Sequence, residues 1–193
     1  MDIYYPDNGI GELTHYMLEH GERLRVNRGA VLVDEHQSSN ALFLIRRGAV
    51  KCTCTDHKGN PHIVALMFEG ELVGSYLASR LRQPSPFGVV ALEDSVVYAI
   101  DLNAHAAFFE CEHEGRRYVR AFTEHIAHTH LQHYLAQVCL SPWKRLEGLR
   151  QRIPDIMQRI SQRDMAAYIG VSPEALSRHL SAQHQDSDEN LQK

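Results

Sequence analysis

Apolar and polar positions alternate over short stretches between residues 22 and 101. Seven of these stretches are rich in β-branched and aromatic residues and recur about every ten residues; they read ERLRV, AVLVDE, ALFLIRR, AVKCTCT, HIVALMF, GVVAL and SVVYAID. Turn-forming sequences separate them, among them NRG, QSSN, RG and DHKGNP. Because many short strands of even spacing are typical of antiparallel barrels and jelly rolls, we predict an α+β protein that begins with an antiparallel β-roll.

One stretch, ELVGSYLASRLR at residues 71–82, interrupts the strand pattern. Leu72 and Tyr76 are spaced as on one side of a helix, and Leu77 and Leu81 extend the same pattern. The sequence QPSP follows directly, and its prolines favour a turn. We therefore expect a small helix and a turn inserted between two strands of the β-roll.

From Glu112 onward the apolar period changes to that of a helix. The chain has no glycine or proline between Gly115 and Pro142, which allows one helix of up to about seven turns. Its apolar positions do not form one narrow stripe; they are Tyr118, Val119, Phe122, Ile126, Leu131, Leu135 and Val138. A helix that is apolar on more than one side buries more than one face. We therefore expect residues 112–139 to pack on the β-roll and on a second copy, giving a homodimer with Phe122 in the seam.

The remaining sequence has clear helix boundaries. Ser141 and Ser172 each stand as an N-cap residue directly before a proline, and Ser161 with Asp164 forms a capping box. Three short helices are predicted, at about 142–150, 162–169 and 173–182. The expected domains are a β-roll sensing domain (1–111), a dimerisation helix (112–140), a helical domain (141–182) and a polar tail (183–193).

Charge is distributed unevenly along the chain. The net charge is −4, yet residues 144–181 carry seven basic and four acidic side chains. A basic segment on an acidic body suits a small DNA-binding module attached to a sensing domain.

Nothing in the sequence predicts a membrane partner or export. No apolar run reaches the length of about 18 residues that a membrane span needs, and the start MDIYYPDNG lacks the features of a secretion signal. We expect a cytoplasmic protein. Its four cysteines include no C-x-x-C pair, so reduced thiols are expected.

Residues 161–181, SQRDMAAYIGVSPEALSRHLS, contain the most specific motif. The small Ala166 suits a close helix crossing and Gly170 suits a turn. Apolar side chains supply a core: Met165, Ile169, Val171, Leu176 and Leu180. This pattern predicts a helix-turn-helix, with an ordinary helical hairpin as the alternative. The second helix then presents Glu174, Ser177 and Arg178 outward, with His179 as a further candidate, and these residue types contact bases and phosphates in the major groove.

The order of strand-rich domain, long helix and helix-turn-helix ending in GVSPEALSR resembles the cyclic-AMP receptor protein and FNR family of bacterial transcription regulators. This resemblance implies a cyclic nucleotide-binding-type β-roll, a parallel dimer through the long helix, and a second motif helix that enters the major groove of double-stranded DNA. It also implies DNA-reading roles for Glu174 and Arg178, and RNA polymerase as a further candidate partner. The candidate DNA-contacting residues are Ser172, Glu174, Ser177 and Arg178, together with Arg163 as a phosphate contact.

Two features depart from the family pattern. Pro173 stands where many members carry an arginine, so one base contact is expected to be missing. The end of the chain, AQHQDSDENLQK, is acidic and lacks strand character, so the usual β-hairpin wing is expected to be absent. Because acidic residues beside DNA repel phosphate, the affinity for one half-site should be low and dimerisation correspondingly important.

Family members that bind a cyclic nucleotide hold the ribose with a Gly-Glu pair, and the phosphate with an arginine followed by Ser or Thr. With Gly74 aligned to that glycine, Ser75 replaces the glutamate and Ser85 replaces the arginine. A serine does not replace a charge-assisted phosphate contact, so we expect no cyclic nucleotide, an effector of unknown identity, and no cofactor required for the fold. In a shifted register Glu71 would supply a carboxylate, and Arg80 or Arg82 would supply a cation. The candidate pocket residues are therefore Glu71, Gly74, Ser75, Arg82 and Ser85.

Histidine is abundant, with 13 residues, and four of them crowd the long helix: His125, His128, His130 and His133. They form two pairs on different faces, whereas a metal needs three or four ligands, so only a dimer could combine them. A haem- or metal-linked redox sensor on the same scaffold is the first alternative. An iron–sulfur site is not expected, because no cysteine precedes Cys52.

A cupin-like metalloenzyme is the second alternative, because β-rolls resemble cupins. The nearest candidate ligands, His57 and His62, flank a turn five residues apart, whereas the cupin pattern needs two histidines separated by a single residue. No glycine-rich phosphate loop or Ser/His/Asp constellation is found elsewhere. We therefore predict no enzymatic activity and no resident metal.

Overall fold

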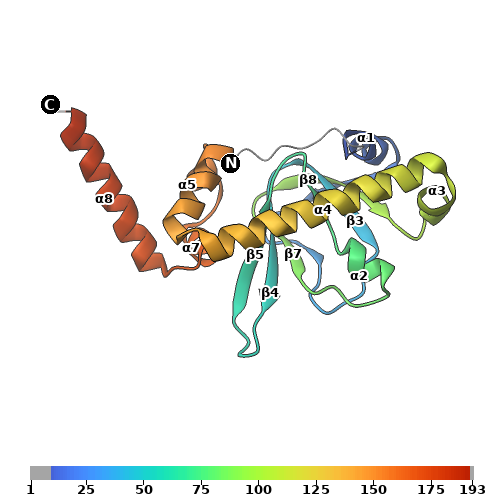
Figure 1. Ribbon diagram of the computed structural model, residues 1–193, viewed down its shortest axis with the longest axis horizontal. Helices are drawn as coiled ribbons and strands as arrows, with labels where there is room; N and C mark the ends of the chain where they lie inside the picture. Colours follow the sequence, from blue (N-terminus) through green and yellow to red (C-terminus); the bar gives the residue numbers. More distant parts are fainter. Residues whose placement is uncertain (1–9, 192–193) are drawn as a thin grey trace. The chain divides into compact units, whose positions relative to one another are not determined.

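The computed structural model describes residues 10–191, with side chains described up to residue 183 (Figure 1). The chain forms two compact units that divide between Ala136 and Gln137. The helices of the first unit are α1 (Ile10–His20), α2 (Tyr76–Arg80), α3 (Ala106–Cys111) and most of α4 (His113–Cys139). The second unit contains the end of α4 together with α5 (Pro142–Arg152), α6 (Ile156–Arg159), α7 (Gln162–Ile169) and α8 (Pro173–Leu191).

Eight strands build the first unit. They are β1 (Glu22–Val26), β2 (Val31–Val33), β3 (Ala41–Arg47), β4 (Val50–Thr55), β5 (Pro61–Met67), β6 (Leu72–Val73), β7 (Gly88–Ala91) and β8 (Ser95–Asp101). They form two four-stranded antiparallel sheets, in the orders β1-β8-β3-β6 and β2-β7-β4-β5. Two packed open sheets of this kind make a jelly roll, not a closed barrel. The predicted α+β fold with an N-terminal β-roll is confirmed.

Strand β3 buries side chains on both of its faces. Phe43 and Ile45 lie in the core between the two sheets, whereas Leu42 and Leu44 lie in a second core beneath the helices. Successive side chains of a strand point to opposite faces, so a strand covered on both sides is apolar without alternation. This accounts for the unbroken run ALFLI at the start of β3.

The second core lies between the sheet that contains β3 and the helices. Leu13 and Met17 of α1, Phe109 of α3 and Phe122 of α4 are buried in it. The rings of Tyr76 and Phe122 meet edge to face, with their centroids 5.5 Å apart. Phe122 therefore packs on its own β-roll, and the prediction that it faces a second copy is wrong.

The two halves of α4 differ in their surroundings. The N-terminal half covers the β-roll with Tyr118, Val119, Phe122 and Ile126, as predicted for one of its apolar sides. In the C-terminal half four apolar side chains remain 40 to 65% exposed: Leu131, Tyr134, Leu135 and Val138. Because residues three and four apart are neighbours on a helix surface, these four side chains form one continuous strip.

The inserted helix is shorter than predicted. Leu72 belongs to strand β6, which pairs with Phe43 and Leu44 of β3, and α2 begins only at Tyr76. The chain crosses β3 closely at Gly74, where a side-chain Cβ would lie 2.5 Å from the carbonyl oxygen of Ala41. This close approach keeps the backbone out of a helix until β3 has been passed.

The end of α8 also differs from the prediction. The helix was expected to end near residue 182, yet it continues to Leu191, so most of the expected polar tail at 183–193 is helical. Residues 182–190 contain no proline or glycine, and nothing in their sequence ends the helix. Residues 192 and 193 lie outside the described part of the chain. Among the helices that are described, none has the length and apolarity to cross a membrane.

Candidate nucleic-acid interface and effector pocket

The predicted helix-turn-helix is formed by α7 and α8. Its inner face is fully buried and consists of Met165, Ala166, Ile169 and Leu176. Gly170 ends α7 with a φ of 76°, and its backbone N–H donates to the carbonyl oxygen of Ala166. Glycine adopts this left-handed conformation without steric cost, which explains why the turn falls at this residue.

Side-chain caps fix where both motif helices begin. The hydroxyl of Ser161 accepts a hydrogen bond from the backbone N–H of Asp164 at 3.0 Å and donates to its carboxylate at 2.8 Å. The hydroxyl of Ser172 accepts from the backbone N–H of Ala175 at 3.2 Å. The predicted N-caps at Ser161 and Ser172 are thus present in the structure, and Asp164 is paired with Ser161 through its carboxylate.

The candidate DNA-contacting side chains all lie at the surface: Arg163, Ser172, Glu174, Ser177 and Arg178. Hydrogen bonds from its own backbone N–H and from Ser172, with the nearby charge of Arg178, hold the pKa of Glu174 below its usual value. Glu174 is therefore an acceptor at neutral pH, one helical turn from the permanent donor Arg178. A carboxylate suits the amino group of cytosine, and a guanidinium suits the two acceptors of guanine.

His179 does not point outward. Its ring stacks on Trp143 of α5, with ring centroids 3.9 Å apart and planes 14° from parallel. The side-chain amide nitrogen of Gln183 lies 3.2 Å from His179 Nε2, and its oxygen accepts from Arg150 at 3.0 Å. These residues line a hollow of about 470 Å³ between α5 and α8. The role of Trp143 was not predicted from the sequence, although a large apolar residue in a short polar helix is a signal for packing.

Two of the candidate pocket residues meet in the interior of the β-roll. Ser75 and Ser85 are both buried, and their hydroxyl groups are hydrogen-bonded to each other. The Ser85 hydroxyl also donates to the carbonyl oxygen of Phe87 at 2.5 Å. The backbone of Ser85 is held as well, because it donates to Gln37 at 2.9 Å and accepts from His36 at 2.8 Å. The two positions that the family resemblance assigns to ribose and phosphate contacts thus bind each other.

The other three candidates occupy different places. Glu71 lies in the turn between β5 and β6, where its carboxylate accepts from the backbone N–H of Phe68 at 2.6 Å. Gly74 lies against the backbone of Ala41. Arg82 is exposed just after α2, with a φ of 54°. Glu71 thus serves a turn, and the guanidinium of Arg82 extends into solvent.

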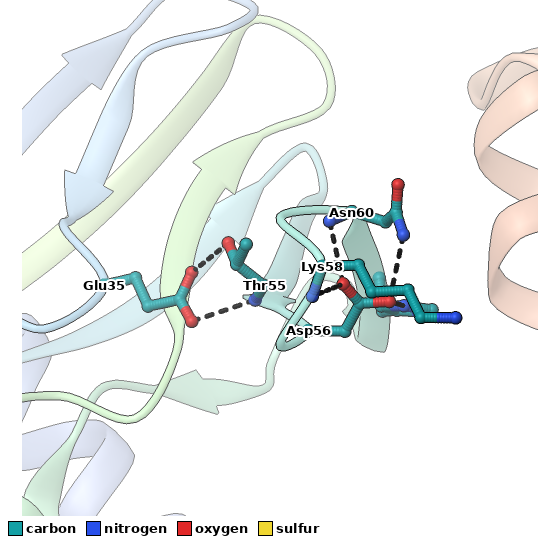
Figure 2. Close-up of polar contacts among 6 residues, drawn as sticks. Glu35, Thr55, Asp56, Lys58 and Asn60 are labelled. Carbon is teal, nitrogen blue, oxygen red and sulfur yellow. Dashed lines mark hydrogen bonds and ion pairs between the residues drawn. The ribbon is translucent and has the colours of Figure 1, made fainter.

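Of the cupin-like candidates, His57 lies in the turn between β4 and β5, and His62 is the second residue of β5. Figure 2 shows Asp56, Lys58 and Asn60 of this turn. The carboxylate of Asp56 accepts from the backbone N–H groups of Asn60 at 2.9 Å and Lys58 at 2.8 Å, and from the ring of His62 at 3.1 Å. These hydrogen bonds, chiefly that from Asn60, hold the pKa of Asp56 far below its usual value. His62 therefore contributes to a hydrogen-bonded turn, and among the residues that the structure describes neither His57 nor His62 belongs to a cluster that could hold a metal ion.

Histidines on α4 show no metal-binding arrangement. Within residues 10–191, no three His, Cys, Asp or Glu side chains come together in a way that could hold a metal ion. Burial, with a smaller effect of the nearby His128, lowers the pKa of His125, so its ring is neutral at pH 7. Burial, with a smaller effect of Glu71, raises the pKa of the Cys52 thiol to about 12, which leaves that thiol unreactive.

Comparison with known proteins agrees with this architecture. The cyclic nucleotide-binding domain family matches residues 23–111. The transcriptional regulatory protein btr of Bordetella pertussis is 26% identical over 184 residues, which cover 90% of this chain and 74% of btr.

Solved structures show the same fold over most of the chain. The c-di-GMP responsive global regulator CLP of Xanthomonas campestris has a TM-score of 0.69 at 14% identity, covering 92% of each chain. FixK2 of Bradyrhizobium japonicum has a TM-score of 0.65 at 18% identity, covering 86% of each chain. The catabolite activator protein of Thermus thermophilus has a TM-score of 0.55 at 23% identity, covering 91% of this chain and 84% of that one.

The chain thus combines a cyclic nucleotide-binding-type domain with a helix-turn-helix. Residues 23–111 match the cyclic nucleotide-binding domain family. Over most of its length the chain has the fold of the solved CLP, FixK2 and catabolite activator protein structures, as its motifs predicted.

Proposed function

We propose that this protein is a homodimeric transcription regulator that places α8 in the major groove of double-stranded DNA. The observation that carries this proposal is the helix-turn-helix itself, which buries one face and exposes the candidate contacts on the other. Arg178 would donate to guanine, Glu174 would accept from cytosine, and Arg163 would contact phosphate. Ser172 and Ser177 would add hydroxyl contacts to bases or phosphates. The relative btr is a transcriptional regulatory protein and CLP is a global regulator of gene expression, which supports the same function.

The homodimer is supported by the exposed strip on α4. Leu131, Leu135 and Val138 follow the spacing of a helix that packs along a second helix. A parallel second copy of α4 would cover the strip and bring two α8 helices to one DNA duplex. RNA polymerase is a further expected partner, and the protein would act in the cytoplasm.

The β-roll is proposed to work without a cyclic nucleotide. A cyclic phosphate entering at Ser85 would have to break the buried pair with Ser75. It would find a hydroxyl where the cyclic-nucleotide-binding members of the family that the sequence resembles offer an arginine. The ligand would lose its matched partner and keep its desolvation cost. We therefore expect dissociation constants in the millimolar range or no binding when cyclic AMP and cyclic GMP are titrated by calorimetry. Micromolar binding of either would contradict this part of the proposal.

Selection of binding sites from random DNA tests the main proposal. An inverted repeat with half-sites about 10 bp apart, or a multiple of that distance, is the expected result. No enrichment at low salt would contradict it, because low salt favours every protein–DNA contact.

A further inference from the structure

The side chain of Arg145 connects two helix ends in the second unit. Arg145 lies in the first turn of α5, and its Nη1 donates to the backbone carbonyl oxygens of Gln137 at 3.3 Å and Leu140 at 3.0 Å. Its Nη2 donates to the carbonyl oxygen of Ile169 at 2.5 Å. Gln137 lies in the last turn of α4, and Ile169 is the last residue of α7. One guanidinium therefore contacts the ends of both α4 and α7.

These carbonyl groups need a partner from outside their own helix. The last four carbonyl groups of an α-helix have no intrahelical donor, and the C-terminal end of a helix carries partial negative charge. A guanidinium meets both needs, because it is always charged and holds its donors in a fixed planar fork. Arg145 thus caps α4 and α7 together.

The position of the guanidinium is tightly determined. The Nε of Arg145 is buried and has no hydrogen-bond partner among the described residues, although an unpaired buried donor is unfavourable. The free energy gained from the hydrogen bonds to the carbonyl groups must therefore exceed the cost of keeping Nε buried without a partner. A Cβ added to Gly170, which begins the turn into α8, would lie 3.5 Å from Arg145 Nη2.

We propose that Arg145 is a positioning residue that joins the last turn of α4 and the helix-turn-helix into one rigid body. This inference rests on the proposed DNA-binding function. Helix α4 is continuous up to Cys139, and α8 follows the turn directly after Ile169. Holding Ile169 against Gln137 therefore fixes the direction in which α8 leaves the last turn of α4. In a dimer that direction sets the half-site spacing, so Arg145 determines operator spacing without touching DNA.

The test compares Arg145→Gln and Arg145→Lys with a matched control in the full chain. The control is Lys144→Gln, because the exposed Lys144 pairs with Glu147 at 2.8 Å and its loss removes the same charge from α5. Arg145→Lys keeps the charge but replaces the planar guanidinium with a single ammonium group. It is the test variant if Arg145→Gln does not fold. Affinities are measured for the selected operator and for the same operator with one base pair inserted between its half-sites. The insertion turns one half-site by about 35° relative to the other.

The spacing preference is the decisive quantity. Wild type and Lys144→Gln should bind the lengthened operator at least about tenfold more weakly than the selected one. This ratio of dissociation constants corresponds in free energy to the loss of about one charge-assisted hydrogen bond. For Arg145→Gln the ratio should fall below about threefold, with Arg145→Lys between, because a loosened joint adapts to the new spacing. A merely stabilising residue would change both affinities equally. An Arg145→Gln protein that keeps the full spacing preference would overturn the proposal.

Hydrogen exchange of backbone amides gives a second readout that needs no DNA. In Arg145→Gln, exchange should accelerate about tenfold at residues 138–141 and at residues 170–171 together, and Lys144→Gln should leave both unchanged. Faster exchange in only one of the two segments would overturn the joint. If exchange accelerates in both segments but the protein selects no operator from random DNA, the DNA-binding function and the role of Arg145 in spacing would be overturned. The structural link between α4 and α7 would still stand.

Discussion

Removal of the Ser85 hydroxyl tests whether the β-roll is closed by its own side chains. Because this hydroxyl donates to the carbonyl oxygen of Phe87, it must accept the hydrogen of Ser75. Ser85→Ala therefore leaves two groups without their partner, the Ser75 hydroxyl and the Phe87 carbonyl. At about 1 to 3 kcal/mol for each of the two unpaired groups, the free energy of unfolding should fall by about 2 to 6 kcal/mol. Ser75→Ala leaves the bond to Phe87 intact and should cost only about 1 kcal/mol.

The double variant gives the sharper result. In a Ser85→Ala protein the Ser75 hydroxyl is buried and unpaired, so its removal relieves a cost. The double variant should be no less stable than Ser85→Ala alone, and the two single effects should exceed the double effect by about 1 to 2 kcal/mol. Urea unfolding followed by circular dichroism measures these values, and fluorescence of Trp143, the one tryptophan, monitors the second unit as a control. Strictly additive effects would refute the closed pair.

Other predictions follow from the same structure. Arg178→Ala should weaken operator binding by about 1 to 3 kcal/mol and relax preference at one base pair, whereas Arg163→Ala should weaken all sequences alike and reduce the salt slope by about one, as measured by fluorescence anisotropy at several salt concentrations. Val138→Glu, at a side chain 65% exposed, should dissociate the dimer in sedimentation without lowering β-roll stability. Phe122→Ala, at a side chain 2% exposed, should cost about 3 to 5 kcal/mol and leave the dimer intact, and the reverse pattern would contradict our assignment of the two α4 surfaces. Because the pKa of His125 is lowered in the folded state, the unfolded chain takes up more protons as the pH falls through its value of about 6.5. Thermal melts should therefore show stability falling from about pH 7 to pH 5, and an equal slope in His125→Gln would contradict this reasoning.

Local signals in the sequence predicted local structure well. Ser161 and Asp164 interact although they are only three residues apart, so the local sequence was enough to predict where α7 begins. Strand β6 could not be read in the same way. Leu72 and Tyr76 are four residues apart, which imitates a helix, but Leu72 pairs with Leu44 of β3. Such a pairing depends on a distant segment and leaves no local pattern.

The candidate sites follow the same division. The motif predicted which residues of α8 could reach DNA, yet the direction of His179 depends on its packing against Trp143 of another helix. The family resemblance pointed to Ser75 and Ser85 as the positions where serines replace a glutamate and an arginine. The hydrophobic pattern of the sequence, however, carries no information about whether two hydroxyl groups ten residues apart meet in the folded chain. Arg145 was counted only as one of seven basic residues, because its backbone acceptors lie at the ends of helices that come together only on folding.

The two-faced strand β3 has a consequence for how the first unit unfolds. Leu42 and Leu44 anchor the helices, while Phe43 and Ile45 of the same strand anchor the opposite sheet. If α1 and α4 detach, one face of β3 meets water and the register that holds the other face weakens with it. The helices and the two sheets should therefore unfold together. We expect the first unit to lose its structure in a single cooperative transition, with no stable intermediate that retains only the sheets.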